Sequence, residues 1–357
     1  MARRIFVAMI LSLVLTTLVH AEKIVVVAGG GTEKENTPAT SCKLRKPFGV
    51  DFDSSGNMYI VEIEGQRLLK VDSTGKLTII AGTGEKGTGI ADGPATKATF
   101  NGIHNLAVLP SGDVIISDTW NNSVRRFDVK ADQVIVVAGT GEKGFSGDSG
   151  PAKQAKFGGV FCTSLDPNQL RLLVADLDNR RIRAIDLTTG IVTTVAGNGQ
   201  KGVPKNGAVA TESPLADPRA VAADKNGNIY IVERGGNALR CVDKQGKIRT
   251  VVGTGVAGNT GDDGDALQAT LKGPKHLCVE ANGDVLIADT DNHVVRRYSP
   301  TSGKIVRIAG TGKVGKEGLG GDPQKCELSQ PHGVTVDSHG TIFICDGYND
   351  RVLKIEQ

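Results

Sequence analysis

One short phrase recurs six times along this chain of 357 residues. It is an apolar run that ends on an acidic residue, as in "NMYIVE", "DVIISD" and "DVLIAD". A constant period of this length predicts a series of equal structural units. The closing acids follow one another at intervals of 56 to 58 residues and are Glu62, Asp118, Asp176, Glu233, Asp289 and Asp346.

Each unit contains four runs of alternating apolar and polar residues, which is the pattern of a β-strand. In the fifth unit the runs cover residues 276–280, 284–289, 294–299 and 304–310, and turn residues such as Asn282-Gly283 separate them. Six units of four antiparallel strands predict an all-β fold, a six-bladed β-propeller. A closed ring is favoured over a linear stack because closure leaves no exposed sheet edge.

The two ends of the chain complement one another. The last unit has strand patterns near residues 332–336, 341–345 and 351–355, and then the chain ends at Gln357. The strand that this unit lacks matches residues 23–28, which repeat the phrase that ends the second unit. We therefore expect three C-terminal strands and one N-terminal strand to share a blade and close the ring.

The first 21 residues have a different character. Arg3 and Arg4 precede an apolar run that extends to about Leu18, and Ala21 ends a small-residue cleavage pattern. The run is shorter than the roughly 20 residues of a membrane-spanning helix. The sequence therefore predicts a signal peptide over residues 1–21, cleaved after Ala21, and a secreted or periplasmic protein without a membrane span. Residues 22–357 are expected to form a single domain and a monomer.

Phrases such as "PHGVTVDSHGTIFICDGYNDRVLKIE", residues 331–356, resemble the NHL repeat, with its Pro-x-Gly-Val opening, glycine turn and Asp-x-x-Asn segment. The resemblance extends over essentially all of residues 22–357, and the 17-residue connections between units resemble those of bacterial secreted NHL proteins. It implies the six-bladed propeller. NHL propellers include binding modules, receptor ectodomains and a few lyases and hydrolases, so the fold alone does not give the function.

Two repeated motifs are expected to be structural. Gly-x-Gly-x-x-Gly occurs at residues 82–87 and 139–144, but no helix follows to receive a dinucleotide, and its first glycines return in later units. The strand-ending acids occur in every unit. Each Asp is followed three positions on by Asn, and four units carry Arg seven positions on, so we expect these acids to hold turns.

The net charge and the cysteines limit which partners and which disulfide bonds the chain can have. Basic and acidic residues nearly balance, which argues against a nucleic-acid partner. In an exported chain the six cysteines could form three disulfides. A bridge between Cys42 and Cys326 is possible because they occupy equivalent places in adjacent units, but the pattern leaves the connectivity open. The cysteines are Cys42, Cys162, Cys241, Cys278, Cys326 and Cys345.

Two positions of the repeat vary, and these are the candidates for a ligand site. One opens the first strand of each unit, where a propeller has the mouth of its central channel, and the other lies two residues past each acid. We expect Arg219 and Lys275 to meet an anionic group, and Trp120, Tyr348 and Phe48 to meet a flat apolar one. The alternative is that these residues simply close the channel. The candidate ligand-binding residues are Phe48, His104, Trp120, Phe161, Arg219, Lys275, His332 and Tyr348.

The sequence therefore favours a binding module without a cofactor, whose partner is a protein, a glycan or a small anionic molecule. The alternative is a metal-dependent lyase or hydrolase, for which the peptide-amidating lyases are the model. In those enzymes, which resemble this fold, histidines entering alternate blades hold zinc. His104 and His332 match two such positions, with zinc or calcium as the implied metal. The third position holds Arg219, and His276 is one residue out of register, although three protein ligands are usual for catalytic zinc. No catalytic residue is assigned.

Overall fold

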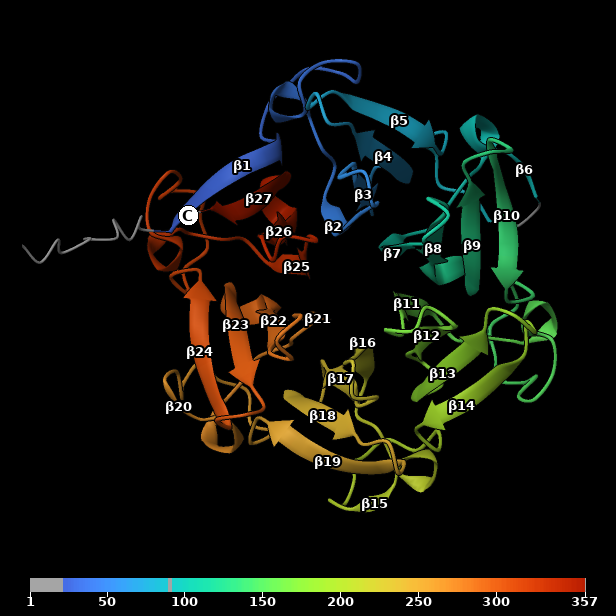
Figure 1. The fold of residues 1–357 in the computed structure, drawn as a ribbon, viewed down its shortest axis with the longest axis vertical. Coiled ribbons are helices and arrows are strands. Elements are labelled where there is room, and N and C mark those ends of the chain that lie inside the picture. The colour runs from blue at the N-terminus through green and yellow to red at the C-terminus, as the bar shows by residue number, and fades with distance from the viewer. Residues whose placement is uncertain (1–21, 89–91, 357) are drawn as a thin grey trace, which may run out of the picture.

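The computed structural model describes residues 22–88 and 92–356 and shows six antiparallel sheets around a central axis (Figure 1). The predicted all-β, six-bladed propeller is confirmed. The signal peptide predicted over residues 1–21 lies outside the described residues. Within them, no helix has the length and apolar character needed to cross a bilayer.

Each blade consists of four main strands, ordered from the axis outward. The first three blades consist of β2 (Pro47–Phe52), β3 (Met58–Glu62), β4 (Arg67–Val71) and β5 (Leu77–Ala81); β7 (Ile103–Val108), β8 (Val114–Asp118), β9 (Ser123–Asp128) and β10 (Gln133–Ala138); and β11 (Val160–Leu165), β12 (Arg171–Asp176), β13 (Arg181–Asp186) and β14 (Val192–Ala196). The fourth and fifth consist of β16 (Pro218–Ala223), β17 (Ile229–Glu233), β18 (Ala238–Val242) and β19 (Lys247–Val252); and β21 (His276–Val279), β22 (Val285–Asp289), β23 (Val294–Ser299) and β24 (Lys304–Ala309).

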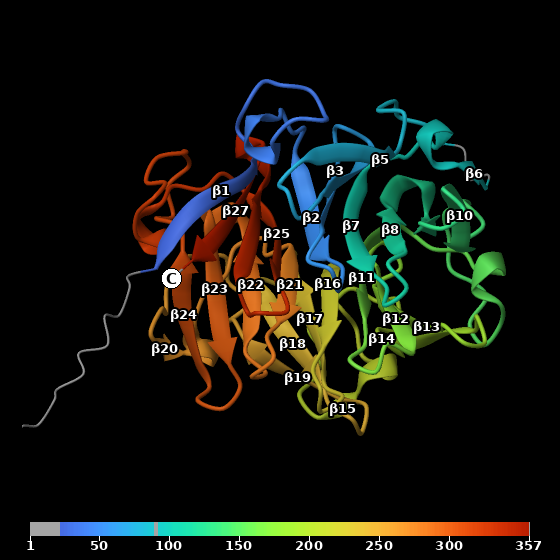
Figure 2. The ribbon, with the colours of Figure 1, turned by 45° about the horizontal axis from the view of Figure 1, so that its top comes forward.

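The sixth blade joins the two ends of the chain, as expected. It consists of β25 (Pro331–Val336), β26 (Ile342–Asp346), β27 (Arg351–Glu356) and β1 (Lys23–Gly29). β1 pairs antiparallel with β27, from Lys23 opposite Glu356 to Gly29 opposite Arg351. In Figures 1 and 2 the blue first strand lies along the red last one. The ring is therefore closed by hydrogen bonds between its two ends.

The connections between blades add short edge strands that the repeat pattern does not reveal. Three of them contribute a two-residue fifth strand: β6 (Gly93–Pro94) on β10, β15 (Ala208–Val209) on β19 and β20 (Gly264–Asp265) on β24. The connection into the sixth blade makes similar contacts, since the Gly320 N–H donates to the Ile24 carbonyl. Each connection thus crosses the outer edge of the next blade, which covers that edge and explains the constant connection length.

Nine short 3-10 helices in the described residues lie in the connections between blades and in three of the turns between second and third strands. Those in the connections are η1 (Ala39–Ser41), η2 (Ala95–Lys97), η4 (Ala152–Gln154), η5 (Ala210–Glu212), η6 (Ala266–Gln268) and η8 (Pro323–Lys325). Those between second and third strands are η3 (Thr119–Asn121), η7 (Thr290–Asn292) and η9 (Gly347–Asn349).

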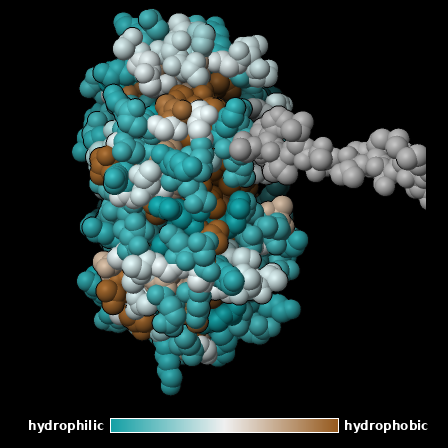
Figure 3. All heavy atoms as spheres, turned by 90° about the vertical axis from the view of Figure 1, so that its left-hand side faces the viewer, coloured by the Kyte–Doolittle hydropathy of each residue, from teal (hydrophilic) through white to brown (hydrophobic). Residues whose placement is uncertain are grey.

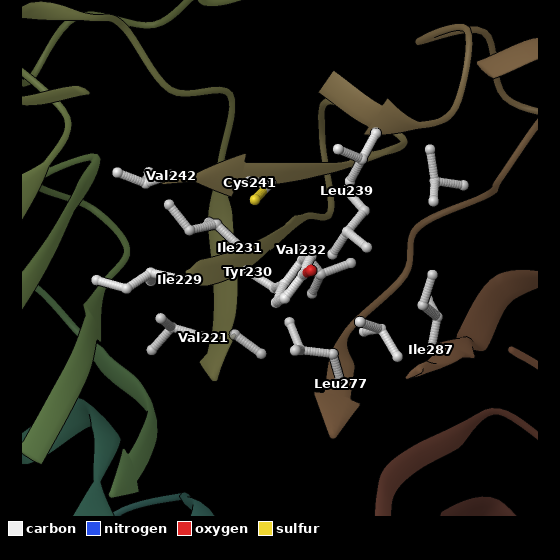
Figure 4. Close-up of a cluster of buried hydrophobic side chains, with 14 of the residues drawn as sticks. Val221, Ile229, Tyr230, Ile231, Val232, Leu239, Cys241, Val242, Leu277 and Ile287 are labelled. Atoms are coloured by element: carbon white, nitrogen blue, oxygen red, sulfur yellow. The ribbon is translucent and has the colours of Figure 1, made fainter. Parts of the chain in front are cut away.

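The apolar faces of neighbouring blades pack on one another and form the core. Figure 4 shows one such cluster, in which Tyr230, Val232 and Leu239 of the fourth blade face Leu277 and Ile287 of the fifth. The outer wall is mostly hydrophilic, with small separate apolar patches (Figure 3). The interior therefore lies between blades, and each blade depends on both of its neighbours.

The strand-ending acids form buried corners, as expected. Asp118 accepts from the Asn101 N–H at 2.8 Å and from Asn121 Nδ2 at 2.9 Å, and Arg125 Nη1 lies 3.5 Å from it. The Glu corners replace Asn by glycine because the longer side chain fills that space: a Cβ at Gly65 would overlap Glu62 Oε2. These corners hold the turns between the second and third strands.

All six cysteines are free, so Cys42 and Cys326 do not form a bridge. Cys42 Sγ lies 3.2 Å from Thr37 Oγ1, and Cys326 Sγ donates to the Glu327 carbonyl at 3.4 Å. Burial raises the pKa of the Cys162 and Cys278 thiols to about 11. The thiols are therefore protonated and behave as small apolar groups.

Candidate functional site

The innermost strands place the variable residues on one face of the ring. Phe48, His104, Phe161, Arg219 and His332 are each the second residue of an inner strand, and Lys275 immediately precedes β21. The start of each inner strand pairs with the end of the next strand, as with Pro47 opposite Glu62 and Ile103 opposite Asp118. These strand starts and the turns between second and third strands therefore share a face, which we call the mouth face.

Five of the six strand-opening residues form a continuous series of contacts from one blade to the next around the mouth of the channel, and we call them the mouth cluster. Phe48 stacks on His332 with ring centroids 3.6 Å apart, and His104 meets the edges of Phe48 at 5.5 Å and Phe161 at 4.7 Å. The guanidinium of Arg219 lies 3.8 Å from the centroid of the Phe161 ring. Phe48, His104, Arg219 and His332 are buried. The mouth cluster closes the channel at this level, and Phe48 lies beneath the surface instead of forming part of it.

Trp120 and Tyr348 lie above this buried layer, and 48% and 47% of their surfaces are exposed. Trp120 stands perpendicular to His104 at 5.3 Å, whereas Tyr348 stacks on His332 at 6.0 Å. The Trp120 ring packs on the backbone of Gly102, where φ is +71° and a Cβ would overlap the indole. Each ring is thus positioned by the cluster and still faces solvent.

A lysine accompanies each exposed ring. Lys46 Nζ lies 4.4 Å from the centroid of Tyr348, and Lys86 Nζ lies 5.4 Å from that of Trp120. Both distances are within the range of a cation–π interaction. Lys46 also pairs with Glu64, which raises the pKa of this lysine. The mouth face therefore combines flat apolar surfaces with flexible cations at their margins.

The two buried histidines are neutral. Each uses Nδ1 to hydrogen-bond a backbone carbonyl two residues earlier, at 2.7 Å for His104 and 2.9 Å for His332. Burial lowers the pKa of both imidazoles well below 6.5, and the charges of Arg219 and Lys275 lower it further. With Nδ1 donating, Nε2 is left as an acceptor.

The cations of the mouth face differ in their partners. Lys275 Nζ lies 3.1 Å from Asp291, and Arg234 Nε lies 2.7 Å from Asp217. Within residues 22–88 and 92–356, Arg219 is buried with no carboxylate partner, and its Nη1 makes no hydrogen bond. Burial lowers its pKa to about 9, and the neighbouring charge of Arg234 contributes.

The two histidines of the mouth cluster are the predicted ligands of a metal ion. His104 and His332 lie on either side of Phe48, which contacts both rings. Across the part of the chain that the structure describes, no group of three or more His, Cys, Asp or Glu side chains is arranged to hold a metal ion. Zinc or calcium at these two histidines therefore stays a hypothesis for metal analysis of the purified protein.

A second polar layer lies below the mouth cluster, and it was not among the features predicted from the sequence. Asn105 Nδ2 and His276 Nε2 meet at 2.9 Å across the channel, and the Val334 N–H donates to His276 Nδ1 at 3.3 Å. Asn105 and His276 hold the same position in opposite blades, where the other units have Gly49, Cys162, Ala220 and Gly333. Two large polar residues among four small ones were the signal that could have revealed it.

The second layer borders a cavity of about 230 Å³ within the channel, lined by residues from all six inner strands. Asp51 is its acidic group, and burial raises the pKa of this carboxyl to about 6. Both Asp51 oxygens accept backbone N–H groups, from Phe52 at 2.9 Å and Val108 at 2.8 Å. Asp51 therefore links the first two inner strands.

The second layer makes stability depend on pH. Burial lowers the pKa of His276 to about 4 in the folded protein, against about 6.5 when unfolded. Between these values the unfolded chain binds a proton that the folded chain does not, so the free energy of unfolding falls as the pH falls. Between pH 7.5 and pH 5, the free energy of unfolding should therefore fall by about 1 to 2 kcal/mol less in His276→Gln than in the wild type. Urea unfolding at both pH values measures this. Exposed His339, changed to Gln, should keep the wild-type profile, and identical profiles for His276→Gln and the wild type would refute the assignment.

Comparison with known proteins gives two matching family profiles. The NHL repeat matches residues 100–127 and 328–355, and the teneurin NHL domain matches residues 188–258. The chain is 26% identical over 339 residues to the protein SUPPRESSOR OF QUENCHING 1, chloroplastic, of Arabidopsis thaliana, which covers 91% of this chain and 32% of that protein. It is 21% identical over 338 residues to NHL repeat-containing protein 2 of Gallus gallus, covering 87% and 46%. The chain thus spans less than half the length of these curated relatives.

Solved structures share the architecture at low sequence identity. An auxiliary nutrient binding protein from Bacteroides thetaiotaomicron superposes with a TM-score of 0.67 and 15% identity, covering 94% of this chain and 76% of that one. A streptogramin B lyase superposes with a TM-score of 0.54 and 13% identity, covering 94% and 98%. At these identities the likeness concerns the fold alone. The repeat profiles, the NHL-repeat relatives and the closed ring of six blades show together that this chain belongs to the NHL-repeat family.

Proposed function

We propose that this protein is a binding module whose ligand or partner docks on the mouth face. The observation that carries the proposal is the pair of half-exposed rings, Trp120 and Tyr348, held on either side of the buried mouth cluster. Burying a ring of this size normally stabilises a fold, so two that face solvent together are typical of a recognition surface.

The chemistry of the face suits a ligand with a flat apolar part and an anionic part. Trp120 and Tyr348 offer the apolar contact, and Lys46 and Lys86 lie beside the same rings. A small molecule, a glycan face or a protein loop can meet this description. The nutrient-binding role named for the Bacteroides protein of similar fold agrees with a binding function.

We further propose that the protein acts outside the cytoplasm after removal of residues 1–21. The basic pair and short apolar run at the N-terminus support this. Mass spectrometry of protein recovered from the periplasm or medium should give a mature N-terminus at Glu22. A product that keeps residues 1–21 would contradict the proposal.

A thermal-shift screen of sugars, carboxylic acids and peptides tests the binding function. Hits should raise the melting temperature of the wild type, since a ligand at 100 times its Kd stabilises by about 2.7 kcal/mol. The Trp120→Ala/Tyr348→Ala variant should bind at least roughly tenfold more weakly, because each aromatic contact contributes about 1 kcal/mol or more.

The matched control is Val129→Ala/Leu170→Ala, which also removes two exposed apolar side chains, but from turns remote from the mouth face. It should bind as the wild type does. Hits that survive the Trp120/Tyr348 change, or that the control abolishes, would move the site away from the mouth face. Failure of the whole screen to find such a ligand would count against the proposal.

A further inference from the structure

Arg219 differs from the other deeply buried arginines that the structure describes. Each of those has a carboxylate partner, whereas Arg219 has neither an ion pair nor a hydrogen bond to a protein acceptor. The paired residues are Arg125 with Asp118, Arg183 with Asp176 and Asp148, Arg240 with Glu233, Arg296 with Asp289 and Asp262, and Arg351 with Asp346. A guanidinium carries five N–H donors, and the buried Nη1 of Arg219 is a donor that no protein acceptor satisfies.

A cation in this state is costly, since burying a charge without a partner disfavours folding. The neighbouring acids offset it only in part, because Asp291 is already paired with Lys275, and Asp217, whose charge raises the pKa of Arg219, is paired with Arg234. Once these pairs cancel, Arg219 is the cation of this group that is left without a counter-charge. The group that completes the site therefore carries one negative charge.

The orientation of Arg219 indicates which kind of anionic group it can bind. One face of the guanidinium is covered by the Phe161 ring at 3.8 Å, so its free N–H groups lie in the plane along its edge. Two parallel N–H donors in a plane match the two oxygens of a carboxylate. A phosphate monoester, which is close to a dianion at neutral pH, would need a second uncompensated cation.

A surface pocket lies beside this site on the same face, and two of its residues, Asp217 and Arg234, act electrostatically on Arg219. The pocket has a volume of about 410 Å³ and lies between the third and fourth blades. Basic side chains outnumber acidic ones in its wall, which favours the approach of an anion. Its charged residues are Lys143, Asp178, Arg180, Lys201, Asp217 and Arg234.

We propose that the ligand of the mouth face carries a single carboxylate, and that Arg219 binds this group through paired N–H donors. The inference rests on the proposed binding function and deepens it. Three successive contacts lead from Arg219 through Phe161 and His104 to Trp120. The ligand class is therefore a small aromatic or cyclic carboxylic acid, with its acid group at Arg219 and its ring toward Trp120.

Calorimetry at constant ionic strength tests this with defined probes. Indole-3-acetate and phenylacetate should bind the wild type and raise its melting temperature, whereas phenylacetamide, phosphate and chloride should not. Arg219→Met should weaken carboxylate binding roughly a hundredfold, because truncation of a buried hydrogen-bonded charge partner has a large effect. Without ligand, Arg219→Met should melt at or above the wild-type temperature, since it removes an unpaired charge.

Arg171→Met is the matched control, since it removes the same charge from an exposed, paired position at the end of β12 that lies away from the mouth face. It should change carboxylate affinity by no more than a few-fold. Arg219→Lys, which keeps the charge but lacks the planar fork, should bind at least roughly tenfold more weakly than the wild type. It serves as the test if Arg219→Met fails to fold.

Two outcomes overturn the inference: no carboxylate binds, or carboxylate binding survives the changes at Arg219. Equal effects of phenylacetate, phosphate and chloride would also overturn it, because they would indicate a general ionic effect. The result is separable from the proposed function. Binding that needs Trp120 and Tyr348 but not Arg219 would refute only the carboxylate site at Arg219. Binding that needs Arg219 but neither ring would refute only the proposed role of the two aromatic rings.

Discussion

Deletion of residues 22–30 is expected to lower the free energy of unfolding by more than 5 kcal/mol and to leave most of the protein unfolded or aggregated. The segment contains β1, which supplies the fourth strand of the sixth blade. Ile24 and Ala28 are fully buried in two different core clusters, so their loss opens both. Burial of Ile24 alone accounts for about 2–5 kcal/mol, and the deletion also exposes the edge of β27.

The deletion is measured by urea unfolding and by size-exclusion chromatography. Ile24→Ala provides the same test in a chain that still folds, and it should cost about 2–5 kcal/mol. Lys23→Ala, in the same strand but exposed, should change stability by less than about 0.5 kcal/mol. A truncated monomer with the wild-type unfolding midpoint would refute the closure of the ring through β1.

Glu233→Gln is expected to destabilise the protein by about 3–5 kcal/mol, because it leaves a buried guanidinium without its counter-charge. Glu233 is fully buried, and its Oε2 accepts from Arg240 Nε at 2.8 Å and lies 2.7 Å from Nη2. Its other oxygen accepts from the Ala216 N–H at 2.6 Å. Glutamine keeps the shape and one acceptor but not the charge, so the change isolates the ion pair.

Guanidinium-chloride unfolding of Glu233→Gln, Arg240→Met and the double variant measures the coupling. The double variant should recover a substantial part of the loss, because neither charge is then left alone. Asp217→Asn, which breaks the exposed pair with Arg234, should cost less than about 1 kcal/mol. Additive losses in the double variant would mean that the corner acids do not act through their arginines.

The repeat period, the four-strand blades and the shared last blade follow from local sequence patterns, and the structure confirms them. The same local register correctly grouped Phe48, His104, Phe161, Arg219 and His332 at one mouth, because equivalent positions in a ring lie at equal height. Which of them are buried could not be foreseen. The stacking of Phe48 on His332 joins the first and sixth blades, which are neighbours in the ring but far apart in sequence.

Other features were missed for related reasons. The bond between Asn105 and His276 joins opposite blades, so no local pattern contains it. Corner arginines were predicted for the second to fifth blades only, seven positions after the acid; in the first and sixth blades the structure shows Arg67 and Arg351 in this role, five positions on. A long side chain can reach one buried carboxylate from either position, and sequence spacing alone does not distinguish them.

Hydrogen exchange of the protein with and without a carboxylate found by calorimetry tests the role of the mouth face most directly, because it needs no substitution. Bound ligand should slow exchange in the turns at residues 118–123 and 346–351 and at the start of β16. The turns at residues 109–113 and 337–341, at the opposite ends of β8 and β26, should exchange as in the free protein. Protection confined to those opposite turns, or to the outer edges of the blades, would contradict a binding site at the mouth.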